Sequence, residues 1–222
     1  MSRSSVIVLT LMLVAGTTMV ASAGPERPMC FGRAATIVGT PDDDEINGTP
    51  RNDVIVGRGG SDLIEGRGGN DRICGGGGSD ALRGGDGDDR LAGGARKDFL
   101  EGGAGDDLGL GRDGADHLLG GGGADDLRGG PGREIGTMGH LDGGIFGGPG
   151  NDRLSGGSEG DLVVGGAGHD TLRGNNGDDL VRGKAGDDDL DGGTGTDDLD
   201  GGRGLDACSR GETLQHCETP GS

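Results

Sequence analysis

The chain has 222 residues, of which 58 are glycine, three are phenylalanine and none is tryptophan or tyrosine. Hydrophobic residues make up 29% of it, well below the roughly 45–50% of a typical globular domain, so a conventional layered core is not expected. The formal net charge of −19 disfavours nucleic acid and anionic membranes as partners and favours cations.

The N-terminal segment, residues 1–23, has the pattern of a secretory signal peptide. Arg3 precedes an apolar run from Val6 to Val20, and Ala21-Ser22-Ala23 has the small residues of a cleavage site. The run is too short for a membrane anchor. We therefore expect a mature extracellular chain that starts at Gly24 and has no membrane association, with its four cysteines in disulfides.

From Gly39 to Ser209 the sequence divides into 19 consecutive nonapeptides without an insertion, and we number the positions of each from one to nine. Position six is Asp in all but two, where Glu134 and Gly143 replace it, and position eight is almost always Ile, Leu or Val. A disordered linker has no reason to keep position eight aliphatic. Collagen requires glycine at every third residue. The register therefore predicts a repeat fold.

The residue types within each nonapeptide point to a hard cation. Aspartate supplies charged oxygen of the kind that Ca²⁺ binds at about 2.3–2.6 Å, and glycine lets backbone carbonyls turn toward the ion. The three residues after each Asp predict a very short strand with its middle side chain facing inward. Two nonapeptides then form one coil of about 18 residues, and equivalent Asp side chains lie about 4.8 Å apart in successive coils. A divalent cation between them would offset their repulsion, and without it we expect a largely disordered chain.

The pattern GGxGxD followed by x-aliphatic-x resembles the repeats-in-toxin (RTX) nonapeptide family, from Gly39 to Ser209. The resemblance implies an all-β, right-handed parallel β-roll that holds Ca²⁺ between turns, with backbone carbonyls of positions one, three and five completing each shell. Carried over position by position, the implied carboxylate ligands are Asp44, Asp53, Asp62, Asp71, Asp80, Asp89, Asp98, Asp107, Asp116, Asp125, Asp152, Asp161, Asp170, Asp179, Asp188, Asp197 and Asp206.

Several segments depart from the pattern. Position four is not glycine in five nonapeptides, so we expect strained or empty turns at Asp42, Arg51, Arg96, Leu141 and Glu159. Residues 133–146 lose the position-six Asp twice and predict a weak seam between intact rolls. Outside the roll at 39–209, we expect residues 24–38 to form an N-terminal cap and residues 210–222 a C-terminal cap or tail.

The coil geometry restricts the disulfides. Cys74 and Cys208 lie more than seven coils apart, beyond the roughly 7 Å that a disulfide allows between Cα atoms. A Cys74–Cys217 bond would stretch the tail nearly to its limit. The remaining pairing is Cys30–Cys74 with Cys208–Cys217, which would fasten both ends of the solenoid.

No catalytic or zinc-binding set stands out, so we do not expect an enzyme. The four histidines share no ligand spacing, and the acidic residue beside many position-six aspartates is interpreted as incidental. We predict a secreted Ca²⁺-binding protein that folds on meeting extracellular Ca²⁺ and has a structural, adhesive or buffering role. The alternative is a cell-surface or matrix interaction module that binds a protein or glycan through exposed faces of the roll.

Overall fold

The computed structural model describes residues 27–131 and 144–217, and strands form the regular structure in them. No helix in these two segments is long and apolar enough to cross a membrane. The predicted signal peptide, residues 1–23, lies outside the described residues.

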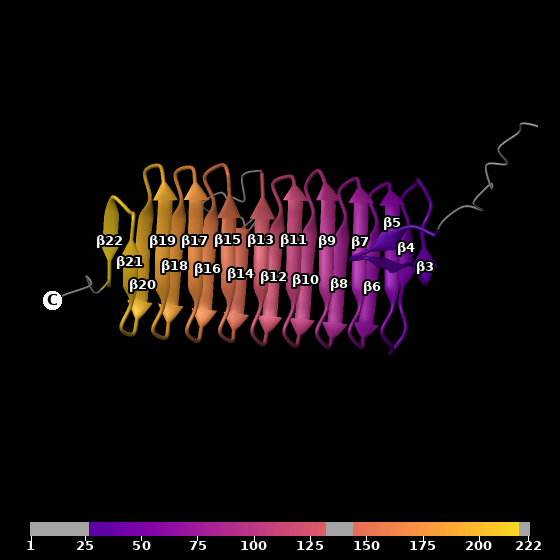
Figure 1. Ribbon diagram of the computed structural model, residues 1–222, viewed down its shortest axis with the longest axis horizontal. Coiled ribbons are helices and arrows are strands. Elements are labelled where there is room, and N and C mark those ends of the chain that lie inside the picture. Colours follow the sequence, from indigo (N-terminus) through magenta and orange to yellow (C-terminus); the bar gives the residue numbers. More distant parts are fainter. Residues whose placement is uncertain (1–26, 132–143, 218–222) are drawn as a thin grey trace, which may run out of the picture.

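Two parallel ten-stranded sheets make up an elongated solenoid, and the chain crosses from one sheet to the other after every strand (Figure 1). The odd-numbered sheet contains β3 (Ile37–Val38), β5 (Val54–Gly59), β7 (Arg72–Gly77), β9 (Arg90–Ala95), β11 (Leu108–Asp113), β13 (Asp126–Gly130), β15 (Arg153–Gly157), β17 (Thr171–Asn176), β19 (Asp189–Thr194) and β21 (Ala207–Ser209). The even-numbered sheet contains β4 (Glu45–Asn47), β6 (Leu63–Gly68), β8 (Ala81–Asp86), β10 (Phe99–Ala104), β12 (His117–Gly122), β14 (Gly144–Pro149), β16 (Leu162–Ala167), β18 (Leu180–Ala185), β20 (Asp198–Arg203) and β22 (Thr213–Gln215). A small antiparallel hairpin, β1 (Met29–Cys30) and β2 (Arg33–Ala34), precedes them.

The coil period is the predicted one over most of the solenoid. In the even-numbered sheet Leu100 pairs with Leu82 on one side and with Leu118 on the other, so each strand lies beside the strand two nonapeptides away. Two nonapeptides therefore form one coil, and the predicted all-β parallel roll is confirmed.

The apolar core is a narrow double row of position-eight side chains. These side chains are almost completely buried and form one continuous cluster, made by Ile55, Ile64, Ile73, Leu82, Leu91, Leu100, Leu118, Leu127, Ile145, Leu154, Val163, Leu172, Val181, Leu190, Leu199 and Cys208. Gly109 is the exception in β11. A Cβ there would lie 2.8 Å from Cδ2 of Leu127, so the neighbouring leucine already fills the space.

The strands are longer than the short triplets predicted from the sequence. Most run from position seven of one nonapeptide to position three of the next. Pairing skips position one, as between Gly102 and Gly120, and resumes at positions two and three, as in Gly103↔Gly121. The turn is thus reduced to positions four, five and six, because positions two and three rejoin the ladder.

The coil offset changes once. Leu118 pairs with Ile145 and Leu127 pairs with Leu154, so these strands lie beside strands that are three nonapeptides away instead of two. Between β13 and β14 the pairing partners are therefore one nonapeptide further apart in the sequence than elsewhere. Residues 132–143 lie outside the described residues, so the weak seam stays a prediction, but both sheets continue past it without a missing strand.

Candidate metal centres

The position-six aspartates form two columns along the inside of the solenoid, one at each row of turns. The long column contains Asp53, Asp71, Asp89, Asp107, Asp125, Asp152, Asp170, Asp188 and Asp206. The second column runs through Asp44, Asp62, Asp80, Asp98 and Asp116 and resumes with Asp161, Asp179 and Asp197. Glu134 and Gly143 fall in the segment that separates its two parts, so the long column passes the seam uninterrupted.

One oxygen of each carboxylate belongs to the scaffold. Along both columns, Oδ1 accepts a hydrogen bond from the backbone N–H of the equivalent Asp one coil earlier, at 2.7–3.0 Å. At the change of offset the same bond joins Asp125 to Asp152 at 2.8 Å. This repeated bond explains why position six is Asp: the side chain must be short, inward-facing and able to accept from the preceding coil.

The other oxygen has no partner in the protein. Oδ2 is buried without a hydrogen bond in Asp62, Asp71, Asp80, Asp89, Asp98, Asp107, Asp125, Asp152, Asp170, Asp179, Asp188, Asp197 and Asp206. An isolated buried carboxylate oxygen is costly unless a cation or donor compensates it. The two columns contain thirteen such unpartnered carboxylate oxygens. Bound cations would compensate their charge, whereas a metal-free interior would not.

Burial raises the pKa of these carboxyls. The pKa of Asp98 and of Asp107 rises to about 7, first because of desolvation and next, against a lowering backbone hydrogen bond, because of neighbouring carboxylates. Desolvation also raises the pKa to about 6 in Asp71, Asp89, Asp116, Asp125, Asp170 and Asp179. At neutral pH each column is therefore a stack of carboxylates whose charged form is disfavoured until an opposing charge is supplied.

Position-one glycines leave room for this arrangement. A Cβ on Gly102 would lie 2.7 Å from the carbonyl oxygen of Gly120 and closer still to Oδ2 of Asp107. The position-one carbonyl and the unpartnered carboxylate oxygen therefore meet in one narrow space. This is the combination of donors that a hard cation requires.

The carbonyls of positions three and five, also predicted as ligands, differ in the contacts that they make within the protein. Position-three carbonyls accept the N–H of position four in the preceding coil at 2.6–3.2 Å, as Ala104 does from Gly87. Each of these has one remaining lone pair. The position-five carbonyl of Asp187 lies 3.3 Å from Nδ1 of His169. The predicted shell from positions one, three and five stays a prediction.

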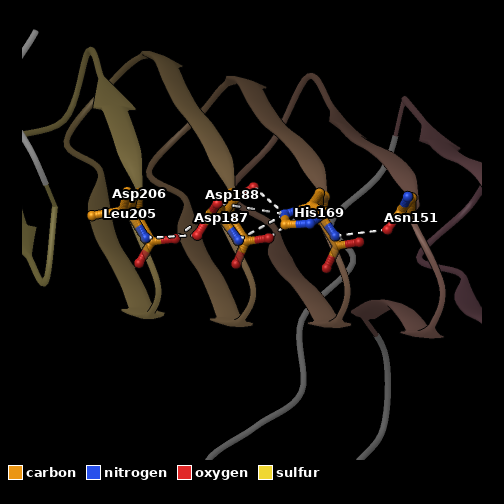
Figure 2. Close-up of polar contacts among 7 residues, drawn as sticks. Asn151, His169, Asp187, Asp188, Leu205 and Asp206 are labelled. Carbon is orange, nitrogen blue, oxygen red and sulfur yellow. Dashed lines mark hydrogen bonds and ion pairs between the residues drawn. The ribbon is translucent and has the colours of Figure 1, made fainter.

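Position five has a structural role that the sequence did not reveal. In Figure 2 a side chain at this position accepts the backbone N–H of the equivalent residue one coil later: His169 donates to Asn151 at 2.8 Å, Asp187 to His169 and Leu205 to Asp187, both at 3.0 Å. The inner bond from Asp188 to Asp206 runs beside this outer ladder. The acidity of position five is therefore not incidental, since Asp and Asn supply the acceptor that links successive turns.

The non-glycine turns are only partly as predicted. Arg96 at position four has a φ of 84°, a strained value for a side-chain-bearing residue, whereas Asp42, Arg51 and Glu159 do not have positive φ. Leu141 lies outside the described residues. The sequence analysis did not predict strain at position two. Five non-glycine residues have φ between 78° and 90° there: Arg58, Arg67, Arg112, Asn175 and Lys184.

A disulfide lies near each end of the solenoid. The structure contains the disulfides Cys30–Cys74 and Cys208–Cys217, with Cα atoms 5.8 and 5.6 Å apart. At the C-terminal end Oε2 of Glu212 accepts the N–H of Asp197 at 2.6 Å and so takes the place of the next position-six Asp. Sequence reasoning missed Glu212, because the turn before it is shorter than the others and breaks the nonapeptide register.

In residues 27–131 and 144–217, no group of three or more His, Cys, Asp and Glu side chains lies close enough together to hold a metal ion by side chains alone. A cation in the columns would therefore rely on backbone carbonyls as much as on carboxylates.

The family model for the RTX calcium-binding nonapeptide repeat matches residues 47–82, 83–114, 102–133, 146–181 and 173–207. The chain belongs to this family. RTX repeats bind Ca²⁺, which agrees with the unpartnered oxygens of the two columns. No match among curated proteins reaches significance. The RTX matches skip residues 134–145, the segment that contains Glu134 and Gly143, the two position-six residues that are not Asp.

Proposed function

We propose that this RTX chain is a secreted Ca²⁺-binding protein whose array folds on meeting extracellular Ca²⁺ and then has a structural, adhesive or buffering role without enzymatic activity. The observation that carries the proposal is the file of buried Oδ2 atoms that lack a hydrogen bond. RTX repeats are a structural Ca²⁺-binding family, which supports a non-catalytic role.

The two oxygens of each position-six carboxylate have different roles. Oδ1 fixes each carboxylate to the rung before it, so that Oδ2 faces the position-one carbonyls without freedom to turn away. We propose as ligands the position-six aspartates from Asp62 onward, with those carbonyls. Bound Ca²⁺ would supply the positive charge that allows the carboxyls to ionise inside the solenoid. Its binding energy then becomes folding energy.

Secretion is supported by the basic, apolar and small-residue pattern of residues 1–23 and by two disulfides, which persist in oxidising compartments. We propose a signal peptide at 1–23, a cap at 24–38, the roll at 39–209 and a cap or tail at 210–222. Extracellular Ca²⁺ is available in the range that weak sites need, about 10⁻⁴–10⁻³ M.

A Ca²⁺ titration of the mature chain, followed by far-ultraviolet circular dichroism, tests this function. We expect a coil-to-β transition at roughly millimolar Ca²⁺ that reverses with chelator, and a much weaker response to Mg²⁺, because Mg²⁺ requires a tighter octahedral shell. A spectrum that does not change with Ca²⁺ would rule the function out.

A second function, an interaction module, is favoured by the outer face of the odd-numbered sheet. Arg72 lies directly opposite Arg90, and its pKa is lowered by burial and then by the nearby charges of Arg33 and Arg90. A groove further along is lined by Arg128, Arg153 and Arg173 together with Asp126, which pairs with Arg128 at 2.8 Å, and uncharged side chains. In a chain with a net charge of −19, arginines stacked on one face suit an acidic partner.

The interaction function is tested by binding of the Ca²⁺-loaded protein to acidic and neutral glycans. Replacing Arg153 and Arg173 with Gln should weaken binding to acidic glycans and reduce its salt dependence. Arg182→Gln, on the even-numbered sheet, is the matched control. Equal binding by the double variant and the control would remove this second function.

A further inference from the structure

The first two nonapeptides, residues 39–47 and 48–56, close their turns in a different way from the rest of the array. Both begin Gly-Thr-Pro, with threonine at position two. Oδ2 of Asp44 accepts the backbone N–H of Thr40 at 2.6 Å and its hydroxyl at 3.0 Å. Oδ2 of Asp53 accepts the N–H and the hydroxyl of Thr49, both at 2.8 Å. The oxygen that is unpartnered further along the array is therefore satisfied here by the chain itself.

The backbone at position two accounts for the difference. Elsewhere this residue usually has positive φ, such as 117° at Gly85 and 84° at Arg67. Thr40 and Thr49 do not have positive φ, which β-branched residues strongly avoid. The following proline also pushes its predecessor toward extended conformations. Threonine therefore turns both of its donors, the amide and the hydroxyl, onto the carboxylate at position six of its own nonapeptide.

Threonine, and not proline alone, closes the turn. Pro149 also occupies position three, but Gly148 before it has a φ of 115° and Oδ2 of Asp152 in the same nonapeptide has no partner. Asn175 at position two, with a φ of 82°, likewise leaves Oδ2 of Asp179 without a hydrogen bond.

The N-terminal end has further internal closure. The hydroxyl of Thr36 lies 3.4 Å from Oδ1 of Asp53 and accepts the N–H of Val54 at 2.9 Å. Buried Ala35 stands where a further position-six Asp would otherwise begin the long column. The Cys30–Cys74 disulfide fastens the β1–β2 hairpin to β7 over this end. Oδ2 of Asp53 thus has its donors within the chain, whereas the single hydroxyl hydrogen of Thr36 is shared between Oδ1 of Asp53 at 3.4 Å and the carbonyl of Val54 at 3.1 Å.

We infer that position two determines whether a half-turn takes Ca²⁺, and that the threonine-closed half-turns at 39–56 form a metal-independent end on which the Ca²⁺-dependent coils stack. Asp44 and Asp53 are then structural acceptors and not Ca²⁺ ligands, although they follow the family pattern. For the coils beyond residue 56 the inference rests on the proposed function.

Hydrogen exchange of the full mature chain in chelator, followed by mass spectrometry, tests the metal-independent end. We expect amides of residues 39–56 to be protected while those of residues 165–182 exchange freely. Thr49→Val, which keeps the branched Cβ but loses the hydroxyl donor, should reduce protection at 39–56 by roughly tenfold, and Thr49→Ser should retain it. Equal exchange in the two segments, or equal protection in Thr49→Val and the wild type, would overturn the inference.

The reverse substitution tests the determinant itself. Lys184→Thr with Ala185→Pro should lower the number of Ca²⁺ ions counted by native mass spectrometry, because Lys184 occupies position two of the nonapeptide whose Asp188 has an unpartnered Oδ2. Lys184→Asn is the matched control, because Asn175 shows that this residue fits an open half-turn. An unchanged ion count in the Thr-Pro variant contradicts the inference.

The two proposals fail in different ways. If residues 39–56 are protected in chelator but the array never takes up Ca²⁺, the proposed function fails and the closed end stands. If the array folds with Ca²⁺ but residues 39–56 exchange as fast as the rest in chelator, the closed end fails and the function stands.

Discussion

Adding one methyl group at position one tests how tightly the solenoid interior is filled. In Gly102→Ala the new Cβ would lie 2.7 Å from the carbonyl oxygen of Gly120, 2.8 Å from Cβ of Asp107 and closer still to Oδ2 of that aspartate. A backbone carbonyl moves less freely than a side chain, so the carboxylate must shift. Its shift weakens the 2.8 Å hydrogen bond from Asp89 to Oδ1.

The expected cost combines overpacking, about 1–3 kcal/mol, with the partial loss of one buried hydrogen bond, about 1 kcal/mol. We expect the free energy of unfolding in saturating Ca²⁺ to fall by about 3 kcal/mol. With a urea m-value of about 2 kcal/mol per molar, the midpoint would drop by about 1.5 M.

Gly122→Ala is the matched control for this change, in the next even-numbered strand. A Cβ at Gly122 meets nothing within 4 Å, and its φ is not in the left-handed region. This variant should be neutral or more stable by about 0.5 kcal/mol, because alanine has less freedom in the unfolded chain. Urea unfolding followed by circular dichroism measures both variants. If the two variants unfold at the same urea concentration, the space near Asp107 is not filled as described.

Two further predictions concern pH and the disulfides. Because burial raises the pKa of carboxyls such as Asp107 from 3.8 to about 7, the metal-free native state binds more protons than the unfolded chain between these two pH values. The free energy of unfolding of the metal-free state should therefore fall as pH rises through this window, whereas the affinity for Ca²⁺ should rise. Circular dichroism measures the first quantity and calcium titrations the second, each as a function of pH. If both quantities change with pH in the same direction, the reasoning is contradicted. Removing Cys30–Cys74, with a sequence separation of 44, should cost about 4 kcal/mol by loop closure, and removing Cys208–Cys217, with a separation of 9, about 2.5 kcal/mol. In thermal unfolding with Ca²⁺, the variant with Cys30 and Cys74 replaced by serine should be less stable than the variant with Cys208 and Cys217 replaced. The reverse order would refute the loop-closure argument.

The repeat period and the inward-facing positions six and eight could be predicted because the same residue types recur at these positions in almost every nonapeptide. Alternation along a strand places positions six and eight on the same side, and 19 repetitions leave no doubt about the register. The inward Ile64 and Asp62 and the Cys30–Cys74 pair follow from that register and from the reach of the chain.

The features that could not be predicted depend on partners one coil away. Thr49 and Glu212 occupy positions where the motif offers no guide, and each is recognised only by the carboxylate or amide that it meets. Position five is Asp, Asn, Ser or His in some nonapeptides and Lys, Arg, Ala, Gly, Thr or Leu in others, so the sequence does not show its role as a hydrogen-bond acceptor. The longer offset between Leu118 and Ile145 leaves the nonapeptide count intact and therefore leaves no trace in the sequence period.

The central claim is that cations between rungs supply the cohesion that a large apolar core supplies elsewhere. Small-angle X-ray scattering of the mature chain, first exhaustively chelated and then returned to millimolar Ca²⁺, tests it most directly. We predict a radius of gyration that falls from roughly 48 Å, typical of an unfolded chain of this length, toward roughly 17 Å on Ca²⁺ addition. A chelated chain that already has the smaller radius, and does not change when Ca²⁺ is restored, would contradict the claim.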